Sequence, residues 1–92
     1  MNKDLNFFVN VCKKLKEKYG DRKTTLFFTK TEVKSEYDPQ SNIRWIVCNI
    51  YYWYNDSWEW YIRIHSDDRK IQWLNEDQLV EYIYNNVNAS LY

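Results

Sequence analysis

Few residues of this sequence have side chains that commonly carry out chemistry. His65 is the sole histidine, and Asp67 and Asp68 follow it closely. An acid–base histidine needs a positioned partner and a cleft, and a strand end that enters a polar turn predicts neither. The three residues also lack the ligand spacing of a calcium loop and the four Cys or His ligands of a structural zinc site. We therefore interpret His65 as a surface residue and expect no metal and no cofactor.

The two cysteines are the other reactive side chains. Asn and Asp residues interrupt the apolar residues near the N-terminus, so this segment lacks the continuous apolar centre of a signal peptide. We therefore expect a cytoplasmic protein, in which both thiols stay reduced. Cys48 falls on the core side of a predicted hairpin, which argues against a nucleophile there. A disulfide between Cys12 and Cys48 is the alternative. With a single glycine there is no phosphate-binding loop either, so we predict that the chain is not an enzyme.

Length and composition indicate one α+β domain that spans residues 1–92. Hydrophobic residues make up 45% of the chain, aromatic residues 20% and charged residues 28%, which is the balance of a globular domain. The apolar runs are far shorter than the ~18 residues that a membrane-spanning helix needs, so we expect no membrane partner. Residues 1–23 hold seven Lys/Arg against three Asp/Glu, whereas residues 66–92 hold two against five. A neutral chain with a basic front and an acidic back predicts poor general polyanion binding.

Two amphipathic helices are predicted, one near each end of the chain. The first begins after a cap at Asn2 or Asp4 and ends at Gly20 in a left-handed conformation. Its apolar stripe has helical spacing and consists of Leu5, Phe8, Cys12, Leu15 and Tyr19. The second starts with a capping box of Asn75 and Gln78, preceded by Leu74 as a staple to Leu79. Its buried stripe is predicted to contain Leu79, Val80, Ile83, Val87 and Leu91.

The segment between the helices predicts an antiparallel sheet of three to four strands. Residues 24–33, 43–54 and 58–65 are rich in β-branched and aromatic residues, whereas 34–42 is polar and is expected to be the longest loop. A short fourth strand is predicted at 70–73, with Ile71 and Trp73 pointing inward. We therefore expect a two-layer α+β sandwich of order α-β-β-β-(β)-α with both helices on one face.

The loop between the second and third strands determines which side chains share a face. A three-residue loop at 55–57 opposes Tyr52 with Trp60, Ile50 with Ile62, and Cys48 with Ile64, whereas a two-residue loop would mix polar with apolar residues. The first register places Tyr52, Tyr54, Trp58 and Trp60 mainly in the core. It places on the opposite face Trp45, Val47, Asn49, Tyr51, Trp53, Glu59, Tyr61, Arg63 and His65.

The aromatic rings on that opposite face are the best functional signal in the sequence. An open sheet face normally alternates polar residues, so clustered rings predict a contact surface. Coverage by the first strand, by the long loop or by a second copy in a homodimer is the alternative. The predicted partner-binding residues are Trp45, Tyr51, Trp53, Glu59, Tyr61, Arg63, Asp67 and Asp68.

Two resemblances extend this interpretation. The order helix, three strands, helix resembles the double-stranded-RNA-binding domain, but this second helix begins with the acidic "NEDQ" where that family has a lysine cluster. In size, composition and lack of catalytic motifs, the chain resembles phage-encoded inhibitors of host defence such as anti-CRISPR proteins. That resemblance implies a partner protein, such as a nucleic-acid-binding host nuclease, whose functional surface is occluded. The acidic residues that could occupy a basic groove of that partner are Asp67, Asp68, Glu76, Asp77 and Glu81.

Single-stranded nucleic-acid binding is the alternative function. The outer rings would then stack on bases, and the lysines of the first helix would meet phosphates. From the sequence, only Arg44 and Arg63 lie near the rings, and Glu59 lies among them, so this hypothesis ranks second.

Overall fold

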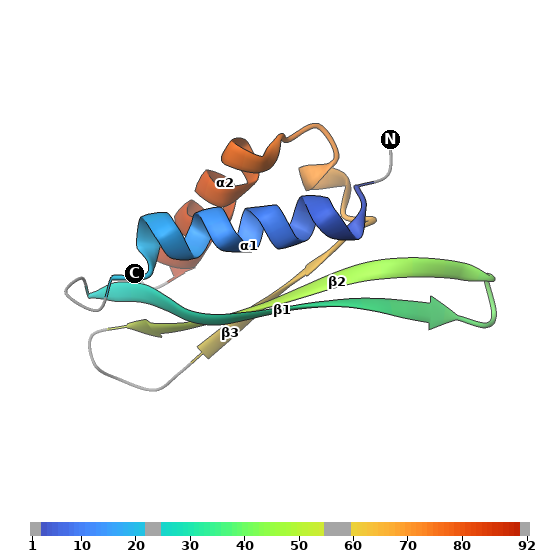
Figure 1. The fold of residues 1–92 in the computed structure, drawn as a ribbon, viewed down its shortest axis with the longest axis horizontal. Helices are drawn as coiled ribbons and strands as arrows, with labels where there is room; N and C mark the ends of the chain where they lie inside the picture. Colours follow the sequence, from blue (N-terminus) through green and yellow to red (C-terminus); the bar gives the residue numbers. More distant parts are fainter. Residues whose placement is uncertain (1–2, 22–24, 55–59, 91–92) are drawn as a thin grey trace.

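The computed structural model describes residues 3–21, 25–54 and 60–90, apart from the side chain of Trp60. The elements are α1 (Leu5–Tyr19), β1 (Leu26–Asp38), β2 (Ile43–Tyr54), β3 (Trp60–His65), the 3-10 helix η1 (Arg69–Ile71) and α2 (Glu76–Ser90). The sheet is antiparallel with strand order β1-β2-β3. This confirms the predicted α+β class and the order α-β-β-β-α. Figure 1 shows both helices above the sheet, with its lower face open.

The start of α1 follows from a side-chain cap. The Asp4 carboxylate accepts a hydrogen bond from the Phe7 amide at 2.9 Å, so Asp4 rather than Asn2, which lies outside the described residues, is the N-cap. The buried stripe is Phe8, Val11, Cys12 and Leu15. Leu5, predicted to belong to this stripe, is 45% exposed.

The end of α1 differs from its prediction in one respect. Gly20 does follow the last helical residue, but its φ of −91° is not left-handed. A Cβ at this position would collide with the carbonyl oxygen of Lys16. Close backbone approach, and not a positive φ, therefore accounts for the glycine.

The capping box of α2 is confirmed. The Asn75 side-chain oxygen accepts from the Gln78 amide at 2.8 Å, and the Gln78 side-chain oxygen accepts from the Asn75 amide at 3.0 Å. Two of the unpaired amide groups at the helix start are thereby satisfied. The buried stripe is Leu79, Val80, Ile83 and Val87, while the predicted Leu91 lies outside the described residues.

The register of β2 with β3 is the one predicted from the sequence. Cys48 opposes Ile64, Ile50 opposes Ile62, and Tyr52 opposes Trp60. The predicted loop at 55–57, the side chains of Trp58 and Trp60, and Glu59 lie outside the described residues. The confirmed pairs place alternate residues of both strands on the same face of the sheet as predicted.

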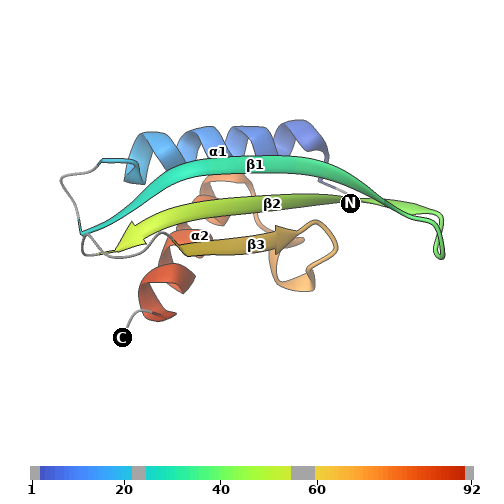
Figure 2. The same cartoon turned by 90° about the horizontal axis from the view of Figure 1, so that it is seen from below.

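The predicted loop at 34–42 is wrong, because β1 continues to Asp38 and only a tight turn separates it from Ile43. Asn42 adopts a φ of 56° in this turn, and its side-chain oxygen accepts from the Tyr37 hydroxyl at 2.6 Å. The charged residues of 34–38 have partners outside this segment. Lys34 pairs with Glu32, and Glu36 pairs with Arg63. The paired ends of β1 and β2 extend well past β3 (Figure 2).

The predicted fourth strand is also wrong. Residues 69–71 form η1, whose start is capped by the Asp68 carboxylate accepting from the Lys70 amide at 3.0 Å. A helical turn does not repeat every two residues as a strand does, so Ile71 and Trp73 do not share a direction. Ile71 is fully buried, as predicted, but Trp73 is 89% exposed.

One hydrophobic core joins the two helices to one face of the sheet. Its sheet members are Leu26, Phe28, Cys48, Ile50, Tyr52 and Ile64. Tyr19 of α1 stacks on Tyr84 of α2 with ring centroids 3.9 Å apart, and Phe28 lies 6.4 Å from Tyr84. Rings from both helices and the sheet thus close one end of the core.

Candidate contact surface on the outer sheet face

We use the term outer face for the side of the sheet opposite the core. The strand pairing and the irregularity between Phe28 and Lys30 decide which β1 residues belong to it, because the register shift changes the parity of the strand. Its described members are Phe27, Lys30, Glu32, Lys34, Glu36, Asp38, Ile43, Trp45, Val47, Asn49, Tyr51, Trp53, Tyr61, Arg63 and His65. β1 thus contributes five charged residues that the sequence analysis had not placed there.

The most exposed ring of this face belongs to a patch that runs across the three strands near the start of β3. Tyr61 is 61% exposed, and its ring centroid lies 5.6 Å from that of the half-buried Tyr51. The Lys30 ammonium lies 4.4 Å from the centre of the Tyr51 ring, on which it makes a cation–π contact. We call Lys30, Tyr51 and Tyr61 the tyrosine patch. Neighbours on both sides hold Tyr51 in place.

A second cluster lies at the far end of β3, where several predicted residues meet. The Trp45 ring lies 5.0 Å from the His65 ring, and His65 Nδ1 lies 2.7 Å from a carboxylate oxygen of Asp67 and accepts from the Asp67 amide at 3.3 Å. Ser66 ties this turn to β2, since its hydroxyl accepts from the Ile46 amide at 3.0 Å. We call Trp45, His65 and Asp67 the tryptophan corner.

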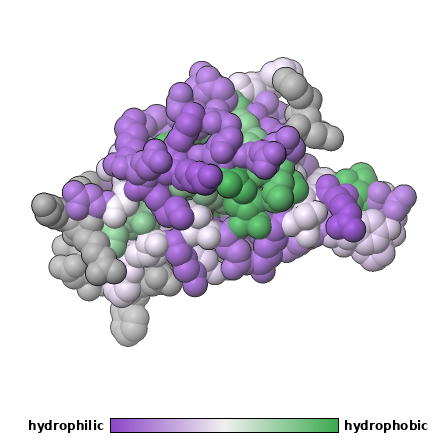
Figure 3. All heavy atoms as spheres, in the orientation of Figure 1, coloured by the Kyte–Doolittle hydropathy of each residue, from purple (hydrophilic) through white to green (hydrophobic). Residues whose placement is uncertain are grey.

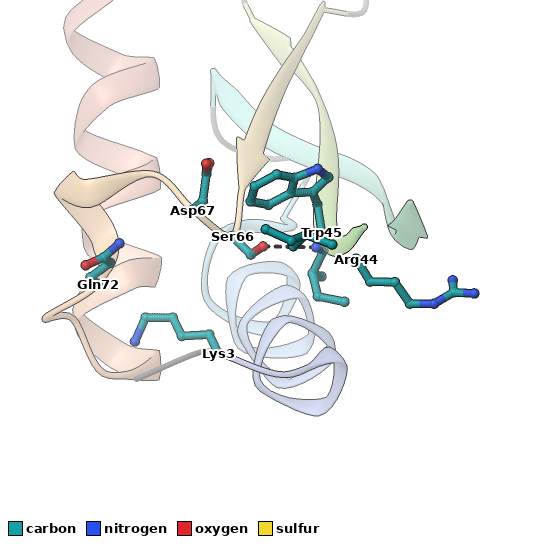
Figure 4. A pocket seen from close by; sticks show the side chains of 8 residues that line it. Lys3, Arg44, Trp45, Ser66, Asp67 and Gln72 are labelled. Carbon is teal, nitrogen blue, oxygen red and sulfur yellow. Dashed lines mark hydrogen bonds between the residues drawn. The ribbon is translucent and has the colours of Figure 1, made fainter. Parts of the chain in front are cut away.

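A small pocket of about 210 Å³ opens beside the tryptophan corner. Figure 4 shows Trp45 on one side of it and Lys3 and Gln72 on the other, while the Arg44 side chain points away. Its polar groups come from the N-terminal segment and from the turn after β3. The volume suits a side chain of a binding partner better than a complete cofactor.

A band of charged residues separates the tyrosine patch from the tryptophan corner. Arg63 donates to the Glu36 carboxylate at 3.0 Å, and Lys34 pairs with Glu32 at 2.7 Å. The side-chain oxygen of Asn49, in the same band, is buried and has no hydrogen-bond partner among the described residues. The rings predicted to form one continuous patch therefore form two, because β1 adds alternating charges between them.

Part of the outer face is itself buried. Val47 has no exposed surface, and Phe27, which opposes Trp53 in the β1–β2 register, is 8% exposed. Trp45, Tyr51 and Trp53 are half-buried, whereas Tyr61 and Arg63 are exposed. The tryptophans thus share in a second, smaller apolar layer, and Tyr61 is the most exposed of the described aromatic residues on the outer face. Glu59 lies outside the described residues.

Part of the uneven charge of the chain is paired between the two helices. Lys14 contacts Glu76 at 3.0 Å and Asp77 at 3.1 Å, and Lys18 pairs with Glu81, which also accepts from the Tyr19 hydroxyl at 2.9 Å. The lysine ammonium groups lower the pKa of the Glu76 and Glu81 carboxyls below the ordinary value. The basic first helix and the acidic start of α2 therefore complement each other.

The acidic residues proposed as partner contacts divide accordingly. Glu76, Asp77 and Glu81 belong to the interhelical pairs, and Asp68 caps η1, so these four already have structural roles. Asp67 remains 59% exposed at the tryptophan corner and is the acidic residue best placed to meet a partner.

Cofactor chemistry receives no support from the described part of the chain. Within residues 3–21, 25–54 and 60–90, no three His, Cys, Asp or Glu side chains gather in a group that could hold a metal ion. None of the described helices is long and apolar enough to span a membrane.

Compared with known protein families, curated proteins and solved structures, the chain shows no significant match. Its function must therefore be argued from its own surface.

Proposed function

We propose that this protein is a small, non-enzymatic protein-binding module whose contact surface is the outer face. It acts by occluding a functional surface of its partner, as inhibitors of host defence nucleases do. The observation that carries the proposal is Tyr61, which is 61% exposed on the edge strand β3 and lies beside the ring of Tyr51 on the central strand. Aromatic anchors of this kind supply a large share of interface energy.

The surroundings of the tyrosine patch favour a protein as the partner. Lys30 and Tyr61 flank Tyr51 from opposite sides, so ordering its ring on binding costs little conformational entropy. Exposed aromatic residues with arginine nearby have the composition of a protein interface. The adjacent charged band holds both signs, with Arg63 paired to Glu36 and Lys34 to Glu32. A surface of mixed charge complements another protein better than it complements a polyanion.

Single-stranded nucleic-acid binding remains the second candidate because of one observation. Lys30 lies over a ring of the outer face, and Lys34 is on the same face, so cations do accompany the rings. Stacking platforms for single strands combine these two features. Glu32 and Glu36 counteract them, and the α1 residues Lys14 and Lys18 pair with carboxylates, which places this function behind protein binding.

A fluorescence-anisotropy titration with a mixed-sequence DNA single strand separates the two candidates. We expect no micromolar binding in salt between about 50 and 200 mM, because the outer face presents both signs of charge. The Lys30→Gln variant and a matched Lys13→Gln variant, which changes a lysine of α1, accompany the wild type. Micromolar binding that weakens steeply with salt, and that Lys30→Gln reduces more than Lys13→Gln, would replace protein binding by nucleic-acid binding.

A further inference from the structure

The two cysteines of the chain meet inside the core, although 36 positions separate them in the sequence. Cys12 lies on the buried side of α1 and Cys48 on the central strand β2, and their sulfur atoms are 3.2 Å apart. Cys12 is 3% exposed and Cys48 is 1% exposed. Two thiols at this separation need to approach by only about 1.2 Å to reach the length of a disulfide bond.

Of the two thiols, Cys12 lines a pocket formed by described residues. A pocket of about 270 Å³ between α1 and β1 is lined by Val9, Cys12, Lys13, Lys16, Thr31 and Val33, and Cys48 is not among its lining residues. Figure 3 shows hydrophobic surface gathered between the helix layer and the sheet on one side of the molecule. A small reagent that enters the pocket therefore reaches Cys12 first.

The polar neighbours assign different roles to the two sulfurs. The hydrogen bond between the two sulfurs lowers the pKa of Cys12 against the opposing effect of burial, and Thr31 and the Lys16 charge lower it further. The pKa of Cys48 is raised by the same hydrogen bond and by burial. Cys12 is thus the thiol that more readily becomes a thiolate, the form that attacks a disulfide.

We propose that Cys12 and Cys48 are a redox-active pair that a small disulfide of the glutathione class converts into an intramolecular disulfide. The Cys12 thiolate attacks one sulfur of the small disulfide, breaks its S–S bond and releases one small thiol. Cys48 then gives up its proton and attacks the Cys12 sulfur of the mixed disulfide, which releases the second small thiol. Two protein thiols are oxidised and one small disulfide is reduced to two thiols.

The bond would join α1 to the central strand of the sheet. Under reducing conditions the pair stays as two thiols, and the disulfide forms when the ratio of oxidised to reduced small thiol rises. A cross-link across 36 positions restricts the unfolded chain and raises the midpoint of thermal unfolding by roughly 10 °C. The pair would therefore make the stability of the fold depend on the redox state of its surroundings.

The test is equilibration of the full chain in mixtures of reduced and oxidised glutathione, followed by acid quenching and mass spectrometry. We expect the wild type to lose the mass of two hydrogen atoms at oxidising ratios, and its unfolding midpoint to rise at the same ratios. Retention of both thiols in the folded wild type at the most oxidising ratio would overturn the proposal. That outcome requires no substitution, so it does not depend on whether a variant folds.

Single-serine variants test the separate roles of the two sulfurs. Cys48→Ser is expected to accumulate a mixed disulfide with glutathione at Cys12, because the resolving thiol is missing. Cys12→Ser is expected to react at least tenfold more slowly than the wild type. The double variant Cys12→Ser with Cys48→Ser shows no redox dependence of its unfolding midpoint if the pair is the origin of the effect. Equal reactivity of Cys12→Ser and Cys48→Ser would contradict the assigned order of attack.

Discussion

The two faces of the sheet are built from alternate residues of the same strands, yet they do different things. Ile50 on the core face has no exposed surface, whereas its neighbour Tyr51 is half-buried and the paired Tyr61 is 61% exposed. The core face packs against both helices in one cluster of apolar side chains. The outer face places rings beside ion pairs and meets no helix within the described residues. The core face therefore supplies most of the stability, whereas the outer face keeps exposed side chains such as Tyr61.

The largest expected effect is the difference in stability loss between one truncation on the core face and one on the outer face. Ile50→Ala should lower the free energy of unfolding by ~2–5 kcal/mol, because it removes fully buried methyl groups and leaves a cavity. Tyr61→Ala, the matched change on the outer face, should cost less than about 1 kcal/mol. Urea unfolding of both variants measures the difference. Equal losses would show that the outer face is also a core face.

A smaller effect is expected at the start of α2, which helps to cover the core face. Asn75→Ala removes the side chain that accepts from the Gln78 amide and should lower the free energy of unfolding by ~0.5–2 kcal/mol. Asn75→Gly should lower the free energy of unfolding by only a few tenths of a kcal/mol, because glycine is tolerated at the N-cap position. A loss from Asn75→Ala no larger than that from Asn75→Gly would contradict the role of the cap in urea unfolding.

The ion pairs between α1 and α2 predict a dependence of stability on pH. The pKa values of Glu76 and Glu81 are lowered from 4.5 in the folded state, so their pairs stabilise the fold above that pH. This contribution is lost as the pH falls through the lowered folded values. Unfolding midpoints should therefore drop on acidification below about 4.5, and Glu81→Gln should flatten that drop.

The control for this pH dependence is Glu17→Gln, which changes an exposed carboxylate elsewhere on α1. It should leave the acid profile nearly as in the wild type, because Glu17 belongs to none of the ion pairs that the described residues form. Identical profiles for Glu81→Gln and the wild type would show that the Lys18 pair has no effect on stability.

The sequence predicted the parts of the fold that local chemistry specifies. Asn75 and Gln78 form the capping box that their spacing indicates, and the β2–β3 register follows from the alternation of Cys48, Ile50 and their partners. Both features depend on neighbours in the chain or on one loop length, so periodicity and turn chemistry were sufficient.

The β1 extension was missed because polar residues stand where the sequence analysis expected a loop. Lys34 and Glu36 alternate with Ser35 and Tyr37 as strand residues do, but their stabilisation comes from Glu32, Arg63 and Arg44 on other parts of the sheet. Charged side chains lower the strand propensity of an isolated segment, whereas ion pairs across the sheet favour the extended form. Continued alternation beyond Val33 was the signal that could have identified it.

The candidate site was also predictable only in part, because some of its features depend on contacts with other strands and helices. The outer-face placement of Tyr51 and Tyr61 followed from the hairpin register, which the structure confirms. The charged band depends on the bulge near Thr29, which changes the parity of β1 and cannot be read from the alternation of one strand. The pairing of Lys14 and Lys18 with α2 likewise depends on how the two helices pack.

We propose that the outer face binds a protein through the tyrosine patch. The most direct measurement is capture from a nuclease-treated host-cell lysate by the tagged wild type, by Tyr61→Ala and by Leu5→Ala, which truncates a 45%-exposed residue of α1 outside the outer face. We predict a specific partner that the wild type and Leu5→Ala retain, and whose capture falls about tenfold or more with Tyr61→Ala. Equal capture by Tyr61→Ala, or loss of capture by the wild type after nuclease treatment, would contradict the claim.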